Sequence, residues 1–292
     1  MELHLRLNRI KHEIEILVNP EMREIYENLM FPHRLEDFEG EKRKIFAIAK
    51  SGMLSEQELF ISQLKLKIPR CEAKVLWTSS LHEAISNASN ASEIYIPSGK
   101  HSMKFLEYLN DNLLFSGMTA YNKDQIVNLN EIPSEYAVIT ASENASFLFA
   151  SDGDLRIENL IINCENVKNG FLIRNGKVTI KNCLIIGNNE SSVTEGLSIS
   201  GTAEVLIENS TICCFATGIT ATDQSRLKIK NTLIKKCNNG INVLADTAMV
   251  TLDKSSIIDC LEYGILKYSA MLNANEIKNK VLDSNKTMEM EE

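Results

Sequence analysis

Proline is scarce in this chain and is missing from its second half. The 292 residues contain five prolines, and the last of them is Pro133. Because proline cannot donate a backbone hydrogen bond to a β-ladder, it is normally kept out of paired strands. Its absence after residue 133 therefore suits a region built from consecutive strands.

Histidine is also missing from that region, and arginine is rare there. The five histidines all precede residue 102: His4, His12, His33, His82 and His101. Beyond Pro133 the only arginines are Arg156, Arg174 and Arg226. Regular structure after residue 133 therefore cannot use a histidine base or a histidine metal ligand.

Other absences narrow the class of protein. No apolar run approaches the roughly 20 residues of a membrane-spanning helix, and the start Met1-Glu2-Leu3-His4 lacks a signal-peptide pattern. The seven cysteines form no C-x-x-C pair, which argues against a zinc site or a disulfide framework. The net charge of −8 argues against a duplex nucleic acid partner. We therefore expect a soluble cytoplasmic protein with reduced thiols, no membrane span and no nucleic acid partner.

The first 71 residues have helical patterns. Apolar residues step by four, three, four and three, which is the spacing of a coiled-coil seam: Leu3, Leu7, Ile10, Ile14 and Leu17. An amphipathic helix packed on its own domain explains this as well as a partner-binding coiled coil. The pattern continues through residues 45–49 and, after the capping box Ser55-Glu56-Gln57-Glu58, through 59–68. We predict a helical segment over residues 1–71.

A second capping box marks the start of the next region. Ser80-Leu81-His82-Glu83 predicts a short helix that plugs the open end of a solenoid, and the apolar strand Ile94–Ile96 follows it. The solenoid is expected to occupy residues 72–270. The polar tail, residues 271–292, is expected to be disordered.

A repeat of 22 to 27 residues is the strongest signal in the sequence. Its five copies are Leu155-Arg-Ile-Glu-Asn159, Val178-Thr-Ile-Lys-Asn182, Val205-Leu-Ile-Glu-Asn209, Leu227-Lys-Ile-Lys-Asn231 and Val250-Thr-Leu-Asp-Lys254. An isoleucine follows each central aliphatic residue by five positions, and a glycine follows it by 11 to 16. We expect three strands per coil with inward residues stacked as aliphatic ladders, glycines at sharp bends, and asparagine amides bonded from coil to coil. The fold class is mainly β, a right-handed parallel β-helix preceded by an α-helical segment.

The outward positions of these coils do not favour catalysis. Enzymes with this fold use clustered acids, calcium-binding carboxylates or an acid pair. Here the residue after each central aliphatic alternates in charge: Glu158, Lys181, Glu208, Lys230 and Asp253. Asp152 and Asp154 flank Gly153, where turn chemistry is the simpler explanation. We assign no catalytic residue, cofactor or metal ligand, and expect a protein that is not an enzyme.

Two outward features are candidate binding surfaces for a partner or a glycan. The coil at residues 188–195 is about four residues longer than its neighbours, and such insertions project from one edge of a solenoid. It contains Asn188, Asn189, Glu190 and Glu195. The second feature is a semi-apolar column that either the N-terminal helices or a partner covers, with packing inside the chain favoured: Ile161, Leu184, Thr211, Leu233 and Ser256.

The segment Glu13-Ile-Glu-Ile-Leu-Val-Asn-Pro-Glu-Met-Arg23, followed by a β-helix opening near Ser80-Leu-His-Glu-Ala-Ile85, resembles the C-terminal part of the Nessun dorma family. The vertebrate relatives of this family are the SHC SH2-domain-binding proteins, and residues 80–101 and 153–265 carry most of the resemblance. It implies a pectin-lyase-like β-helix and a non-enzymatic cytokinesis factor at the midzone, midbody or ring canals. The implied partner is centralspindlin, a complex of a kinesin-6 motor and a Rho-family GTPase-activating protein. The family is also linked to carbohydrate binding, so the alternative is a carbohydrate-binding or vestigial carbohydrate-active module.

Overall fold

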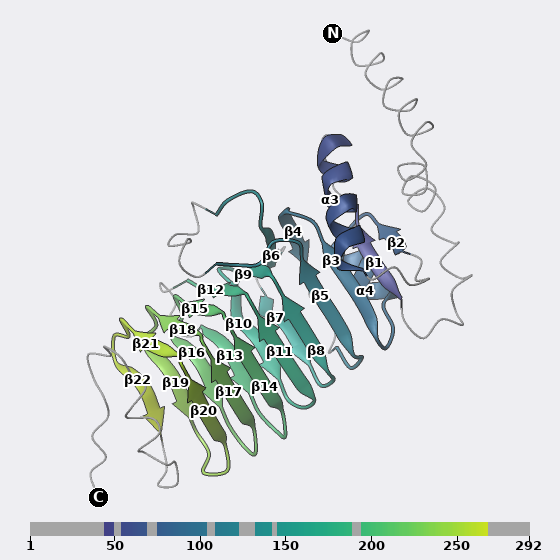
Figure 1. Ribbon diagram of the computed structural model, residues 1–292. Helices are drawn as coiled ribbons and strands as arrows, with labels where there is room; N and C mark the ends of the chain where they lie inside the picture. Colours follow the sequence, from purple (N-terminus) through teal and green to yellow (C-terminus); the bar gives the residue numbers. More distant parts are fainter. Residues whose placement is uncertain are drawn as a thin grey trace, which may run out of the picture.

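The computed structural model describes residues 44–49, 54–68, 75–103, 109–122, 132–141, 145–188 and 194–267 (Figure 1). It is a parallel β-solenoid whose strands form sheets of nine, seven and six members, which we call sheets A, B and C. Each regular coil contributes one strand to each sheet. The predicted parallel β-helix is therefore confirmed.

Strand order in the sheets follows the stacking of the coils. Sheet A runs β2 (Val75–Thr78), β1 (Ile45–Ile48), β3 (Ser92–Ile96), β5 (Leu113–Gly117), β8 (Leu155–Glu158), β11 (Lys177–Lys181), β14 (Glu204–Glu208), β17 (Arg226–Lys230) and β20 (Met249–Asp253). Sheet B runs β4 (Gly99–Met103), β6 (Ala137–Ala141), β9 (Leu160–Asn163), β12 (Leu184–Ile186), β15 (Thr211–Cys213), β18 (Leu233–Lys235) and β21 (Ser256–Ile258). Sheet C runs β7 (Ala145–Ser151), β10 (Val167–Ile173), β13 (Glu195–Ile199), β16 (Thr217–Ala221), β19 (Asn239–Val243) and β22 (Tyr263–Lys267).

The core consists of the predicted aliphatic ladders. The central aliphatic residues of the five copies lie in register on sheet A: Ile157, Ile180, Ile207, Ile229 and Leu252. The isoleucines five positions later align on sheet B, and all of these side chains are buried: Ile162, Ile185, Ile212, Ile234 and Ile257. Phenylalanines extend the core, with the Phe149 and Phe171 rings stacked at 5.0 Å. Neighbouring coils thus complete one another's core.

An asparagine ladder forms the turn from sheet A to sheet B. Its four members have positive φ, from 44° to 59°: Asn159, Asn182, Asn209 and Asn231. Asn182 Nδ2 donates to Asn159 Oδ1 at 3.1 Å, and Asn231 Nδ2 donates to Asn209 Oδ1 at 2.7 Å. Asparagine tolerates this left-handed conformation better than most residues. The predicted stacking of amides is confirmed for these two pairs.

A buried hydroxyl ladder follows the asparagines. Ser210, Thr232 and Ser255 each donate to the carbonyl oxygen two residues earlier, at 2.8, 2.8 and 3.0 Å. Each hydroxyl also accepts a backbone N–H from the preceding coil, those of Cys183, Ser210 and Thr232. The ladder satisfies donors that would otherwise be buried without a partner. Sequence reasoning missed it, although the alignment of the copies places Ser210, Thr232 and Ser255 in one column.

The sequence leads us to expect the repeated glycines at sharp bends, and this prediction is wrong. They lie inside or at the start of the strands of sheet C. None of Gly170, Gly196, Gly218 and Gly240 has a positive φ. They permit close packing instead: a Cβ on Gly218 would lie 2.6 Å from the carbonyl oxygen of Gly240 and 3.2 Å from Ile234 Cγ2. Glycine is therefore needed at these positions because a side chain would not fit, and not because the backbone is left-handed.

Helix α4 (Leu81–Asn87) lies at the N-terminal end of the core, as the capping box predicts. Glu83 N donates to Ser80 Oγ at 3.2 Å, and Glu83 Oε2 accepts from Ser79 N at 2.8 Å. Leu81, Ala84 and Ile85 are buried in the main core cluster. The apolar face of α4 thus covers the end of the solenoid.

The prediction of helix over residues 45–49 is wrong, because β1 lies there between β2 and β3. Phe46 and Ile48 face the core, whereas Ile45 and Ala47 face outward, and all four are buried. A short run that is apolar on both faces carries no periodicity that separates strand from helix. Sheet A therefore includes a strand from the segment expected to be helical.

Helix α3 (Leu54–Lys67) confirms the predicted helix over 59–68 and covers the outer face of sheet A near β1 (Figure 1). Phe60, Ile61 and Leu64 pack on Trp77 and Tyr95, and the Phe60 and Trp77 rings meet edge to face at 5.9 Å. The predicted seam over residues 3–17 and the polar tail lie outside the described residues. The domain limits stay a prediction.

Candidate functional site

The semi-apolar column on sheet B is largely covered by the chain itself. Ile161 and Leu184 are buried beneath Tyr121 and Tyr136, which come from the connection between β5 and β6. Helix α3 lies on sheet A instead. Packing within the chain thus accounts for Ile161 and Leu184, and only the far end of the column, including Leu233, is partly exposed.

The longer coil joins β12 to β13, and its C-terminal end is tied to the next coil. Thr194 is buried, and its Oγ1 accepts from Ala216 N at 3.1 Å. Asn188 and Glu195 are the first and last residues of this coil, and the structure describes both. Asn189 and Glu190 lie outside the described residues.

Glu195 belongs to a polar outer face on sheet C. Thr220 Oγ1 donates to Glu195 Oε1 at 3.1 Å, and Asn242 Nδ2 donates to Thr217 Oγ1 at 3.3 Å. The register places Thr217 beside Asn239, and Thr220 beside Asn242. The side-chain oxygens of Asn239 and Asn242 are buried and accept no hydrogen bond from the described residues. An amide oxygen is a hydrogen-bond acceptor, but these two oxygens are not accessible to solvent.

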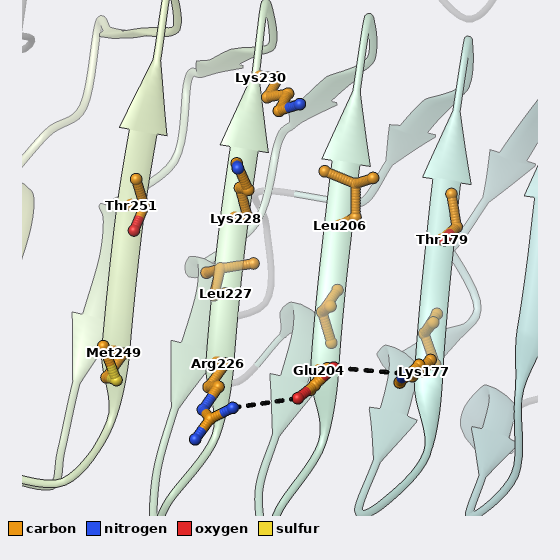
Figure 2. Close-up of a pocket in the computed structure, with 12 residues that line it drawn as sticks. Lys177, Thr179, Glu204, Leu206, Arg226, Leu227, Lys228, Lys230, Met249 and Thr251 are labelled. Carbon is orange, nitrogen blue, oxygen red and sulfur yellow. Dashed lines mark hydrogen bonds and ion pairs between the residues drawn. The ribbon is translucent and has the colours of Figure 1, made fainter.

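A hollow of about 460 Å³ lies on the outer face of sheet A, across β11, β14, β17 and β20 (Figure 2). We call this surface the sheet A hollow; the residues drawn along it include Lys177, Thr179, Glu204, Leu206, Arg226, Lys228, Lys230, Met249 and Thr251. They project outward because strand side chains alternate between the core and the surface.

Ion pairs order part of the sheet A hollow. Glu204 lies between two cations, 3.2 Å from Arg226 and 3.9 Å from Lys177 (Figure 2). Lys181 and Glu208 pair at 3.3 Å in the outward column closest to the sheet B turn. That column is the predicted alternation, and the register confirms that its charged residues lie side by side. Exposed pairs of this kind contribute little stability individually.

Strand β17 differs from its neighbours because all three of its outward side chains are cationic: Arg226, Lys228 and Lys230. Only Arg226 forms an ion pair with another described residue. Lys228 lies between Leu206 and Thr251, which are uncharged. Positive charge is thus locally in excess on a chain with a net charge of −8.

A second cleft, of about 750 Å³, separates α3 from the start of sheet B, and Glu56, Gln63, Lys100, His101 and Glu135 help to line it. His101 Nε2 lies 2.8 Å from the Pro97 carbonyl oxygen. Within the described residues, no group of three histidine, cysteine, aspartate or glutamate side chains could hold a metal ion.

The two candidate carboxylates beside Gly153 are engaged in turns. Asp152 pairs with Arg174 at 2.9 Å, and Asp154 Oδ1 accepts from Lys177 N at 2.8 Å. Each carboxylate therefore holds neighbouring coils together. This geometry agrees with the turn explanation of Asp152 and Asp154.

The described thiols differ in burial and in pKa. Burial raises the pKa of Cys183 and of Cys237 to about 12, and it also raises the pKa of Cys164. Cys214 is half-buried and has a φ of 65°. A hydrogen bond from Cys213 is the main cause that lowers the pKa of Cys214. The positive charges of Lys236 and Lys235 lower it further.

Neither helix in the described part of the chain is long and apolar enough to cross a membrane.

The stacked coils and the surfaces they present define a β-helix protein. The family described as "Right handed beta helix region" matches residues 145–288. The chain is 30% identical to protein nessun dorma of Drosophila melanogaster over 305 aligned residues. The alignment covers 100% of this chain and 50% of that protein, so the chain spans half the length of this relative. No solved structure matches the chain. The resemblance found in the sequence is confirmed: the chain belongs to the Nessun dorma family.

Proposed function

We propose that this chain is a non-enzymatic interaction scaffold whose role is related to that of nessun dorma. The observation that carries this proposal is the sheet A hollow, where a rigid stack of strands presents an excess of cations on an otherwise acidic chain, with Lys228 flanked by uncharged neighbours. A surface of this kind suits recognition of a charged partner. The kinship over the whole chain supports a related role.

The proposed partner is centralspindlin, and the proposed setting is cytokinesis in the cytoplasm, at the midzone, midbody or ring canals. Both come from the family resemblance. The chain, immobilised on beads, is expected to retain the kinesin-6 and GTPase-activating subunits from dividing-cell extract. Another β-helix protein of similar size and charge serves as the control. Equal retention on both proteins would count against centralspindlin as the partner.

The second candidate function is carbohydrate binding by the outer face of sheet C. Its support is the group of neighbouring polar side chains on this face, which includes Glu195 beside the longer coil, Thr220 and Asn242. Side-chain amides and carboxylates are typical partners of sugar hydroxyls. A glycan array tests this proposal. Binding should be lost in Asn242→Ala and kept in Lys168→Ala, and an array without signal for the unmodified chain would remove the candidate.

A further inference from the structure

The three outward cations of β17 form a stripe with a fixed period. Arg226, Lys228 and Lys230 are two residues apart, and a strand rises about 3.3 Å per residue, so their attachment points are about 6.6 Å apart. Arg226 is 66% exposed, Lys228 is exposed and Lys230 is partly exposed. The three residues follow one another along β17 (Figure 2). We call these three residues the β17 stripe.

Charge near the stripe is only partly neutralised by the protein. Glu204 is shared between Arg226 and Lys177, and Glu208 pairs with Lys181. Lys228 has an uncharged neighbour on each adjoining strand. An approaching carboxylate would therefore meet Lys228 without displacing an acidic residue of the chain.

The spacing of the stripe selects a partner. An extended peptide has the same rise as a strand, and its alternate side chains point to the same side. Acidic residues at every second position would thus face Arg226, Lys228 and Lys230 together. The intervening residues would point to solvent. A peptide with three consecutive acidic residues could present only two of them to the cations, because the middle side chain would point to the opposite side.

A protein segment fits this surface better than a nucleic acid. Glu204, Glu208 and Asp253 interrupt the cations on the neighbouring strands. A continuous phosphate backbone would have to cross these carboxylates, and the chain as a whole is acidic. A peptide can place its charges over one strand alone.

We propose that the β17 stripe is the docking surface for an extended acidic segment of a partner protein, with acidic residues at alternate positions. This inference rests on the proposed scaffold function and assigns it a surface and a recognition pattern. It concerns binding through side chains on the face of sheet A. No backbone pairing at a sheet edge is involved.

Two labelled peptides of equal composition test the pattern: Gly-Glu-Ser-Glu-Ser-Glu-Gly and Gly-Ser-Glu-Glu-Glu-Ser-Gly. Fluorescence anisotropy at low ionic strength, where surface charges are least screened, should show at least about threefold tighter binding of the alternating peptide. Equal affinity would overturn the pattern. A lack of saturable binding up to millimolar peptide would overturn the docking site.

Paired variants test the location. Lys228→Glu with Lys230→Glu should weaken binding of the alternating peptide at least about fivefold, whereas Lys228→Arg with Lys230→Arg should retain it. The matched control is Lys100→Glu with Lys168→Glu, which changes the net charge equally on other strands. Similar circular dichroism and melting curves establish that the variants are folded. Equal loss in the control, or tighter binding of a heparin oligosaccharide than of the peptide, would overturn the proposal.

Retention of centralspindlin by the same variants separates this inference from the proposed function. If the unmodified chain and the Glu variant retain it equally, the scaffold stands and the β17 stripe is not its docking surface. If neither retains it but the peptides are discriminated, the docking surface stands and the partner is wrong.

Discussion

Single residues at the turns set the geometry of each coil. Asn182 has a φ of 51° and donates its amide to Asn159 at 3.1 Å. A left-handed conformation costs most residues about 1–2 kcal/mol, and a net hydrogen bond contributes about 0.5–1.5 kcal/mol. The asparagine therefore serves both the conformation and the link between coils.

Replacing Asn182 separates these two contributions. Asn182→Ala loses both and should lower the free energy of unfolding by about 2 kcal/mol, whereas Asn182→Gly keeps the conformation and should cost about 1 kcal/mol. Urea denaturation followed by circular dichroism measures both. If glycine proves as damaging as alanine, the left-handed conformation is not a significant part of the role of Asn182.

The lowered pKa of Cys214 predicts selective reactivity. The thiolate is the nucleophile, and hydrogen bonding from Cys213 with nearby Lys236 and Lys235 favours it. Alkylation by iodoacetamide should be faster at Cys214 than at the other five described cysteines, and its rate should rise with pH and level off below the usual thiol range. Mass spectrometry measures the rate at each cysteine.

Cys213→Ala removes the hydrogen bond that stabilises the Cys214 thiolate. The pH profile of Cys214 alkylation should then shift upward, because the thiolate becomes less favoured. Buried Cys183, whose pKa is raised, serves as an internal reference within the same protein. An unchanged profile would mean that Cys213 does not support the thiolate.

At the scale of elements, α3 is held to sheet A by few residues. Phe60 is 2% exposed and meets Trp77, whereas the adjacent Leu59 is 58% exposed. Phe60→Ala should lower the free energy of unfolding by about 3–5 kcal/mol, and Leu59→Ala should change it by about 0.5 kcal/mol or less. Chemical denaturation of both variants tests this. Equal effects would mean that α3 does not pack on sheet A as described.

Elements that follow the repeat could be predicted from the sequence, and those that depend on distant contacts could not. The central aliphatic residue and the isoleucine five positions later keep their spacing in every copy, and four of the five copies end in asparagine, so the ladders and the asparagine turns are visible without coordinates. Strand β1 has no such copy, and its four apolar residues fit either structure. Tyr121, which covers Ile161, lies in an irregular connection and contacts a strand that is distant in the sequence.

The sheet A hollow was only partly visible in the sequence. Aligned copies give the alternating column that contains Lys181 and Lys230, and this column was predicted. The neighbouring column passes from Leu206 through Lys228 to Thr251. The same alignment contains it, but only parallel pairing in register shows that Lys228 lacks an acidic neighbour. Asn189 and Glu190 stay a prediction, because they lie outside the described residues.

The whole molecule behaves as a stack in which each coil contacts its neighbours. Arg226 and Met249 occupy equivalent positions in adjoining coils. Deletion of residues 226–248 therefore removes one complete coil and leaves β20 to pair with β14. We expect this variant to keep a β-type circular dichroism spectrum and a cooperative thermal transition.

A smaller deletion provides the control. Loss of residues 226–237 removes β17 and β18 but keeps β19, so a strand of sheet C would follow directly where sheet A requires one. This variant should lose cooperative unfolding although fewer residues are removed. Size-exclusion chromatography and thermal scans compare the two. If they tolerate deletion equally, the coil is not the unit of the fold.

The stacking also determines how the molecule bears a load. Strands lie across the long axis of the solenoid, and their hydrogen bonds point along it. A force applied between α4 and β22 would therefore act on the coil interfaces in series, so that every interface carries the full tension. We expect the weakest interface to open first and the chain to lengthen in steps of one coil.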